Sequence, residues 1–267
     1  MNKTALLKLG ILFGIIIFSV IFAYFLSKNS ESFANKQYKY GILICCYNRP
    51  EYVKKTLESL KHTNKSDLNQ SIIYIIDDHS SNKESTSLIE NYDIKDMEGV
   101  ENLELKITRN IRNMGIAKSL EKGFTFLYPK CEYLTNIDSD VLVKPHWLSA
   151  LRNVYEKSNR EKNENNGVLV SGFNCVPPNC AHKILSSNDT YHVKKSIGGI
   201  NIFFHRDMFP KYVPVIGNHI KKWDWNLCYY CDDNKIPIIV SNPSVIQHIG
   251  HNGMNSRGKR YDYAKDF

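Results

Sequence analysis

The sequence predicts an α/β protein in which a mixed, mainly parallel sheet is flanked by helices. Continuous apolar runs such as Tyr40–Cys46 and Ser71–Ile76 have the length and composition of strands that a parallel sheet buries on both faces. Segments with apolar residues at helical spacing alternate with these runs, which is typical of strand–helix–strand units. The sequence therefore predicts a doubly wound sheet, in which ligands bind beyond the carboxyl ends of the strands.

Each further element follows from its residue pattern. The turn after the first strand opens a helix, with Pro50 near its first position and apolar residues at helical spacing up to Leu60. A shorter strand covers Leu103–Ile107, and a helix follows with an apolar face from Ala117 to Leu127. In the second half of the chain, the residue pattern predicts strands over 167–172, 197–206 and 236–240, and a helix over 221–231.

Size and composition fit one globular domain. The chain has 267 residues, 42% hydrophobic and 23% charged, which suffices for one well-packed core. The formal charge of +8 is spread among many acidic residues, and no basic block with interleaved aromatic residues predicts nucleic-acid binding. Cys228 and Cys231 lack a second pair at zinc spacing, whereas Cys175 and Cys180 flank a loop that a disulfide could close.

The first 27 residues are expected to form a short tail and a membrane anchor. Residues 9–27 are uncharged and mostly apolar, and a helix of this length spans about 28 Å, enough for the hydrocarbon core. No clear small-residue cleavage site follows, so we favour an anchor over a signal peptide. Residues 28–38 then form a short stem and 39–267 the globular domain. We expect a single-pass, type II membrane protein with a lumenal domain if the source is eukaryotic or viral.

Polar residues follow three of the predicted strands, at the edge where ligands bind. These residues are Tyr47, Asn48 and Arg49 after the first strand, Asp77 and Asp78 after the second, and Asp138, Ser139 and Asp140 after the run that begins at Tyr133. Residues i and i+2 of an extended chain point to one side, so Asp138 and Asp140 could reach one divalent cation. The alternative is an Asp/Ser-rich turn without chemistry.

In this order the segments resemble the glycosyltransferases of the Rossmann-like GT-A fold, most closely the large inverting family 2, over about residues 40 to 251. The likeness rests on the opening strand and helix, the second-strand aspartates, an Asn-x-Gly-x-Ala helix start and the D-x-D motif. These pieces are residues 42–60, Ile76–Ser81, Asn113–Ala117 and Asp138–Asp140. Cys45 and Cys46 stand where Pro-Thr is commoner in the family.

The resemblance implies a nucleotide-sugar donor, with a uridine nucleotide expected. It implies that Asp77 or Asp78 contacts the uracil or ribose, that Asp138 faces the ribose or sugar, and that Asp140 binds Mn²⁺ or Mg²⁺ at the diphosphate. The other residues expected at the donor are Cys46, Tyr47, Asn48, Arg49, Asn113, Lys118 and Ser139. Lys118 could place a charge near the phosphates, or it could belong to a solvated helix face.

The acceptor side is expected from the second half of the chain. Gly198 and Gly199 could let the backbone approach the sugar closely, or they could form a β-bulge. Asp224 resembles the acid of the family's Glu-Asp motif, with Trp223 in place of the Glu, and would be the general base. Alternatively, Asp224 only stabilises a helix N-terminus. Trp223 and Trp225 would offer ring faces to a sugar.

A histidine near the end of the domain could complete the metal site. His248 lies in an alternating apolar pattern, and a neutral imidazole suits Mn²⁺, as does a carboxylate. His248 could equally be a hydrogen-bonded strand residue. His251 is the second choice.

These expectations combine into a metal-dependent, inverting glycosyltransferase with a hexosyl or N-acetylhexosaminyl donor and a hydroxyl acceptor on a glycan, protein or lipid. One alternative is an N-acetylglucosaminyltransferase of the N-glycan-branching type, whose Asn-Arg-Pro looks similar. Another is a non-catalytic GT-A-like carbohydrate-binding domain, although a pure binder has no need of a base such as Asp224. No Gly-rich loop follows the first strand, which excludes dinucleotide and Walker-type sites and argues against a nucleotidyltransferase.

Overall fold

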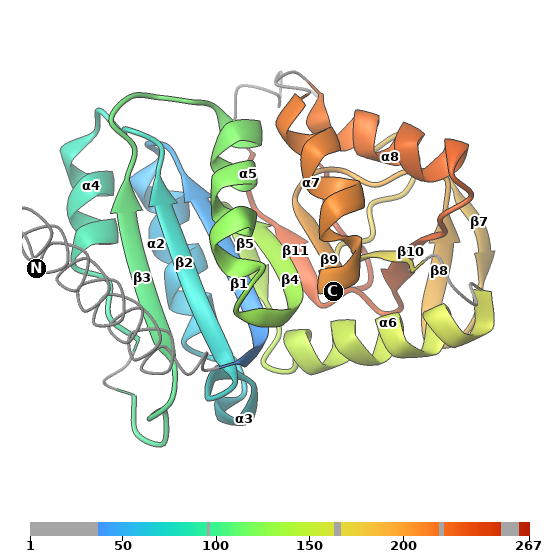
Figure 1. Ribbon diagram of the computed structural model, residues 1–267, viewed down its shortest axis with the longest axis horizontal. Helices are drawn as coiled ribbons and strands as arrows, with labels where there is room; N and C mark the ends of the chain where they lie inside the picture. The colour runs from blue at the N-terminus through green and yellow to red at the C-terminus, as the bar shows by residue number, and fades with distance from the viewer. Residues whose placement is uncertain (1–36, 95–96, 163–166, 219–221, 252–261) are drawn as a thin grey trace, which may run out of the picture. The chain divides into compact units, whose positions relative to one another are not determined.

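A mixed sheet of nine strands, in the order β3-β2-β1-β4-β9-β6-β10-β8-β7, runs through the described part of the computed structural model (Figure 1). The structure describes residues 37–94, 97–162, 167–218, 222–251 and 262–267. A separate two-stranded sheet pairs β5 (Val141–Val143) with β11 (Ile246–His248). The predicted α/β class with a mixed sheet is confirmed.

The first half of the sheet is parallel. Its strands are β1 (Tyr38–Cys46), β2 (Ser71–Asp77), β3 (Glu104–Arg109) and β4 (Cys131–Asp138). Cys46 pairs with Asp77, and Cys45 with Asp138. The carboxyl ends of β1, β2 and β4 are therefore level, and this register brings their polar extensions to one edge.

The second half of the sheet is largely antiparallel. Strand β9 (Asn201–His205) lies between β4 and β6 (Leu169–Ser171) and is antiparallel to both. Strand β10 (Ile238–Ser241) is parallel to β6, and the hairpin of β7 (Ile184–Ser187) and β8 (Tyr191–Lys194) completes the edge. The residues around Gly198 and Gly199 precede β9 as a loop instead of belonging to the strand.

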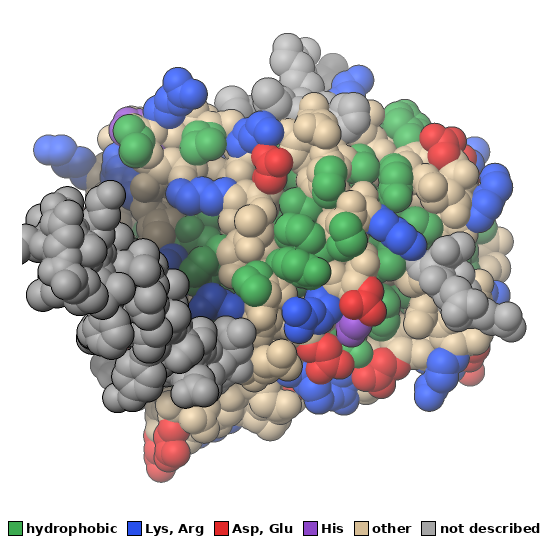
Figure 2. All heavy atoms as spheres, in the orientation of Figure 1, with side chains coloured by type: hydrophobic (Ala, Val, Ile, Leu, Met, Phe, Trp, Pro, Cys, Tyr) green, Lys and Arg blue, Asp and Glu red, His purple; other side chains and the backbone are tan. Residues whose placement is uncertain are grey.

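Helices cover both faces of the sheet. One face packs against α2 (Pro50–Leu60), α3 (Lys65–Leu68), α4 (Lys83–Glu90) and α6 (Trp147–Lys162). The other packs against α5 (Ile116–Leu127), α7 (Phe209–Asn218), which follows the short helix η1 (Arg206–Met208), and α8 (Trp223–Asp233). Figure 2 shows apolar side chains gathered over α5 and α7. Because successive strand residues point to opposite faces, Ile42 and Ile44 join the first core, and Leu43 and Cys45 the second.

Thr56 connects helix α2 to the start of β5. Its hydroxyl donates to the carbonyl of Val141 at 2.9 Å and accepts from the N–H of Val141 at 3.0 Å. Thr56 is fully buried, so this hydroxyl is the partner of two main-chain groups that water does not reach. Helix α2 is thereby fastened to the residue that follows Asp140.

The cysteines behave as the sequence suggested. Cys175 and Cys180 form a disulfide that closes their loop, and Cys228 and Cys231 are buried free thiols on α8. The loop closed by the disulfide includes Pro177 and Pro178.

The predicted localisation requires correction. None of the helices among the described residues is long and apolar enough to cross a membrane, so the assignment of a single-pass membrane protein is withdrawn. The segment expected as the anchor, 9–27, and the stem up to residue 36 lie outside the described residues.

We predict that Thr56→Val lowers the free energy of unfolding by about 2–4 kcal/mol, because valine has the same shape but leaves two buried main-chain groups unpaired. Urea denaturation of the full chain measures this loss. Thr125→Val is the matched control, because Thr125 is exposed and its hydroxyl donates to the carbonyl of Glu121 in its own helix. The free energy of unfolding of this variant should stay within about 0.5 kcal/mol of the wild type. Equal effects of the two substitutions would contradict the role given to Thr56.

Candidate active site

The turn after β1 is shaped by two consecutive left-handed residues, Asn48 (φ 54°) and Arg49 (φ 60°). The side-chain oxygen of Asn48 accepts from the N–H groups of Ser81 and Asn82, both at 2.9 Å, and its own N–H donates to Ser80 Oγ at 2.8 Å. Asn48 was expected at the donor, but this oxygen is committed to the β2–α4 turn. The side chain holds two strand ends together.

The two aspartates at the end of β2 differ in what their oxygens do. Asp78 accepts from Asn110 Nδ2 at 2.7 Å, from the N–H of Met114 at 2.9 Å and from the N–H of Gly115 at 2.8 Å. Asp78 therefore builds the turn before α5, in which the exposed Asn113 also accepts from the N–H of Gly115 at 3.1 Å. These three hydrogen bonds hold the carboxylate of Asp78 in the turn, and the donor contact expected of Asp77 or Asp78 stays a prediction.

Asp77 keeps one oxygen outside the hydrogen-bond network. Its Oδ1 accepts from the N–H of Ser80 at 2.8 Å, and its Oδ2 lies 3.2 Å from Arg109 Nη1 without a hydrogen bond among the described residues. Arg109 also donates to the carbonyl of Ser80 at 2.7 Å. Of the two aspartates, Asp77 is thus the one with a buried oxygen that lacks a hydrogen bond among the described residues.

Asp140 lies beyond the end of β4, in contact with two groups from other parts of the chain. Its Oδ2 accepts from Arg49 Nη1 at 2.7 Å and lies 3.4 Å from His248 Nε2. Its carbonyl accepts from the N–H of Ile249 at 2.9 Å. Burial opposes ionisation of Asp140, but the contacts with His248 and Arg49 outweigh it, and the pKa of Asp140 is lowered.

Gly250 makes the approach of Asp140 and His248 possible. A Cβ at position 250 would lie 2.1 Å from Asp140 Oδ2 and 2.6 Å from His248 Nε2. Burial alone would lower the pKa of His248, yet the Asp140 carboxylate and the carbonyl of Asp262 raise it. Any side chain at position 250 would thus collide with both groups, so only glycine lets Asp140 and His248 pack this closely against the chain here.

Arg49 lies beside Asp140 and has further N–H donors that make no hydrogen bond among the described residues. Its guanidinium carbon lies 4.3 Å from the centroid of the Tyr52 ring, a distance suited to a cation–π contact. Its Nε and Nη2 are buried without a hydrogen-bond partner among the described residues.

The pKa of Asp138 is affected by two other carboxylates, those of Asp140 and Asp224. Burial, then Asp140, then Asp224 raise the pKa of Asp138, against a smaller opposing effect of Arg49. The acid at the end of β4 and the acid at the start of α8 therefore act on one site, although they are far apart in the sequence. This convergence is the main electrostatic feature of the edge.

The loop before β9 and the start of α8 form the other side of the site. A Cβ at Gly199 would lie 2.5 Å from Trp223 Cζ2, so this glycine admits the Trp223 ring. Trp223 is 6% exposed; its ring packs in the core and is not the sugar platform expected. Burial raises the pKa of Asp224, and N–H groups of Trp225, of Asp224 itself and of Gly199 oppose the shift.

His182 belongs to this side of the site and was missed in the sequence. Its ring centroid lies 5.4 Å from that of the partly exposed Trp225, and its Nε2 is 3.6 Å from the position of a Cβ on Gly198. Its Nδ1 is 2.9 Å from Ser196 Oγ. Burial, with help from Lys194, lowers the pKa of His182 to about 4. His182 belongs to no recognisable sequence motif, and it lies in a loop outside the helices and strands.

The remaining predicted residues lie at or near the edge. Cys46 is buried, Tyr47 is 40% exposed, and Ser139 is partly exposed between the two aspartates. The ammonium of Lys118 pairs with Glu121 at 2.8 Å within α5, which favours the solvated helix face. His251 is exposed.

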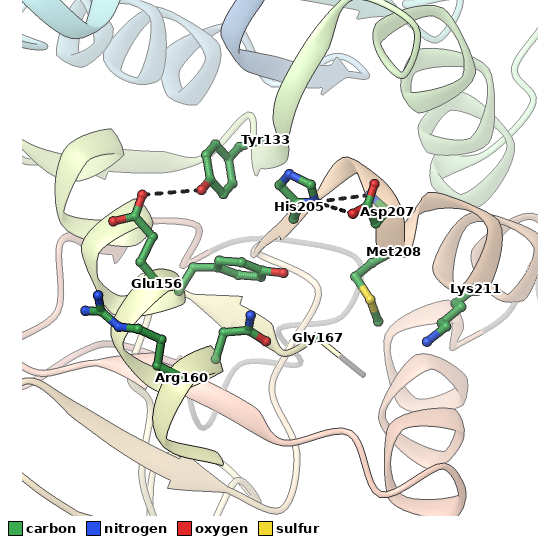
Figure 3. A pocket seen from close by; sticks show the side chains of 10 residues that line it. Tyr133, Glu156, Arg160, Gly167, His205, Asp207, Met208 and Lys211 are labelled. Atoms are coloured by element: carbon green, nitrogen blue, oxygen red, sulfur yellow. Dashed lines mark hydrogen bonds and ion pairs between the residues drawn. The ribbon is translucent and has the colours of Figure 1, made fainter. Parts of the chain in front are cut away.

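A cavity of about 490 Å³ opens elsewhere, around Tyr133, Tyr155 and His205 (Figure 3). Tyr133 pairs with His205 across β4 and β9, five residues before Asp138, or about 17 Å along the strand. Glu156 and Asp207 contact these two rings at its rim. The cavity lies away from the acidic edge and contains none of the predicted site residues.

The fold and the acidic edge are those expected of a glycosyltransferase of the GT-A type. Residues 41–162 match the model of Glycosyl transferase family 2. The resemblance recognised in the sequence is therefore confirmed for this part of the chain. No curated protein matches the chain.

Crystal structures of S. aureus TarS are similar in fold. Residues 1–349 of TarS in complex with UDP-GlcNAc superpose with a TM-score of 0.57 at 14% identity, covering 84% of this chain and 62% of that one. A second structure of the same fragment gives 0.55 at 14% identity over 80% and 61%, and its complex with UDP gives 0.51 at 14% identity over 75% and 57%. The chain spans about three fifths of the length of the first TarS chain.

We predict that acidification destabilises the protein through His182. The folded protein keeps this imidazole neutral down to a pKa of about 4, whereas the unfolded chain binds a proton near 6.5. The free energy of unfolding should therefore fall by about 3 kcal/mol from this residue as the pH drops from 6.5 to 4. Urea titrations at both pH values check this. His182→Gln should lose this dependence, while His146→Gln, at an exposed histidine, should keep it.

Proposed function

We propose that the domain transfers a sugar from a uridine-linked nucleotide donor to an acceptor hydroxyl, with inversion and with a divalent cation. The observation that carries this is the convergence of Asp138, Asp140 and Asp224, from two halves of the chain, on one site at the carboxyl ends of the strands. A binding domain would have no use for a buried acid, Asp138, whose ionisation is opposed by two further carboxylates.

The donor would lie along the ends of β1, β2 and β4. Asp77 Oδ2, which accepts no hydrogen bond among the described residues, is suited to an N–H or hydroxyl of the nucleoside. Nε and Nη2 of Arg49 are suited to phosphate oxygens, since a guanidinium binds phosphate with several donors at once. The complexes of TarS with UDP and UDP-GlcNAc support a uridine nucleotide, and they make an N-acetylhexosamine donor the first to test.

Asp140 and His248 would hold the cation, Mn²⁺ or Mg²⁺. A carboxylate and an imidazole are ligands that Mn²⁺ accepts, and Gly250, which lacks a Cβ, lets both lie close together against the chain. Among the described residues, no group of three or more His, Cys, Asp or Glu could hold a metal; such cations often take one or two protein carboxylates and complete their shell with phosphates and water. When bound, the cation would neutralise the charge that grows on the departing diphosphate.

Asp224 would act as the general base. It lies in the first turn of α8, and burial raises its pKa, which makes its carboxylate a stronger base than an exposed aspartate. It would take the proton of the acceptor hydroxyl as that oxygen bonds to the anomeric carbon. The bond from this carbon to the nucleoside diphosphate breaks on the opposite side, so the configuration inverts. Trp225 and His182 would flank the acceptor.

The tests below also distinguish two other functions. An N-acetylglucosaminyltransferase of the N-glycan-branching type shares the proposed chemistry and differs in its acceptor. A non-catalytic carbohydrate-binding domain would bind sugar without releasing UDP.

We predict that Asp224→Asn lowers the rate of UDP release from UDP-GlcNAc, or from whichever UDP-sugar of a panel is turned over, by about 10²–10⁴-fold, because the amide cannot accept the proton. Donor affinity, measured by calorimetry, should not change. The matched control is Asp233→Ala, which removes an exposed carboxylate from the same helix. A wild-type rate in Asp224→Asn would refute the assignment of the base.

We predict that Asp140→Ala and Gly250→Ala both weaken Mn²⁺ binding by at least about tenfold, since one removes a ligand and the other places a methyl group against Asp140 and His248. The free Mn²⁺ signal in electron paramagnetic resonance, with UDP present, measures this. Asp233→Ala should bind as the wild type does. Unchanged binding in Asp140→Ala would remove the cation from the proposal.

A further inference from the structure

The segment from Asp262 to Phe267 packs along β11, the strand that carries His248. Gln247 is the first point of attachment: its Nε2 donates to the carbonyl of Ala264 at 2.8 Å, and its Oε1 accepts from the N–H of Ala264 at 2.8 Å. Ala264 is buried and belongs to the core beneath the sheet. One side chain thus satisfies both main-chain groups of Ala264, as a neighbouring strand would.

Asp266 is the second point of attachment. Its Oδ1 accepts from Ser244 Oγ at 2.6 Å, and its Oδ2 accepts from the N–H of Ser244 at 3.2 Å and from Asn174 Nδ2 at 3.5 Å. Ser244 is fully buried. The segment is therefore fixed at two positions, Ala264 and Asp266, by partners that lie next to the core.

The consequence of this attachment falls on His248. The carbonyl of Asp262 lies 2.9 Å from His248 Nδ1. Since a carbonyl can only accept, Nδ1 must carry the proton of this hydrogen bond. In the neutral ring Nε2 then holds the lone pair, and Nε2 is the nitrogen that lies 3.4 Å from Asp140 Oδ2.

We propose that residues 262–267 are a positioning element that selects the tautomer and the ring orientation of His248 for binding a divalent cation together with Asp140. This inference rests on the metal-dependent function proposed above. Histidines that bind metals almost always donate their other ring N–H to a carbonyl or carboxylate, which fixes the ring. Here the carbonyl is the main-chain group of Asp262, so no side-chain substitution removes it directly. Its position depends on Gln247 and Asp266, whose side chains hold the segment in place.

The test uses the full chain with Gln247→Ala, Asp266→Ala, the double variant and Gln247→Glu, which keeps an acceptor for the N–H of Ala264 but sets an oxygen against its carbonyl. Lys265→Ala is the control, because Lys265 is exposed within the same segment. Circular dichroism establishes that each variant is folded. The readouts are Mn²⁺ affinity and the ¹⁵N chemical shifts of the His248 ring in the metal-free protein.

The expected result is Mn²⁺ affinity about 10–100-fold weaker in each single variant, the usual effect of losing the outer support of a ligand. The double variant should lose little more than the single ones, because both substitutions release the same segment. The ¹⁵N shifts should show a mixture of tautomers in these variants and protonated Nδ1 in the wild type. Lys265→Ala should match the wild type in both readouts.

Protonated Nδ1 alone in a variant that has lost both attachments would overturn the inference, as would wild-type Mn²⁺ affinity in that variant. A failure of the proposed metal site looks different: His248→Ala would then bind Mn²⁺ as the wild type does. The ¹⁵N shifts would still decide whether the segment sets the tautomer.

Discussion

Buried carboxylates at the ends of parallel strands are the constraint on which this structure depends. A carboxylate removed from water must be compensated by hydrogen bonds or by an opposite charge. Asp78 is compensated by main-chain N–H groups, Asp77 by Arg109, and Asp140 by Arg49 and His248. Each compensation fixes a turn, so the loops around the site take their shape from the acids they surround.

The level strand ends could be predicted from the sequence, because the apolar runs and the polar residues after them fix both the strands and the edge they share. The direction of each side chain could not. Asn48 and Asp78 reach the predicted edge, but their oxygens accept hydrogen bonds from main-chain N–H groups of neighbouring turns. A sequence pattern predicts that a polar side chain lies at an edge of the sheet. Only the three-dimensional structure shows which hydrogen bonds that side chain already makes.

The second half of the site was harder to foresee for a related reason. The resemblance predicts that Trp223 offers a ring face to a sugar. In the structure this ring is buried, because Gly199 has no side chain to occupy its place. His182 lies in a loop, where no hydrophobic periodicity predicts which side chains are buried. Its neighbours Trp225 and Ser196 come from other segments of the chain. Contacts between distant segments carry this information, and one sequence does not display them.

Helix α2 holds the turn of the D-x-D motif at two successive residues. Arg49, which caps the helix, contacts Asp140, and Thr56, in the middle of the helix, contacts Val141. A turn fastened twice to one rigid element moves as that element moves. A displacement of the D-x-D turn would therefore have to break these two contacts or carry helix α2 with it.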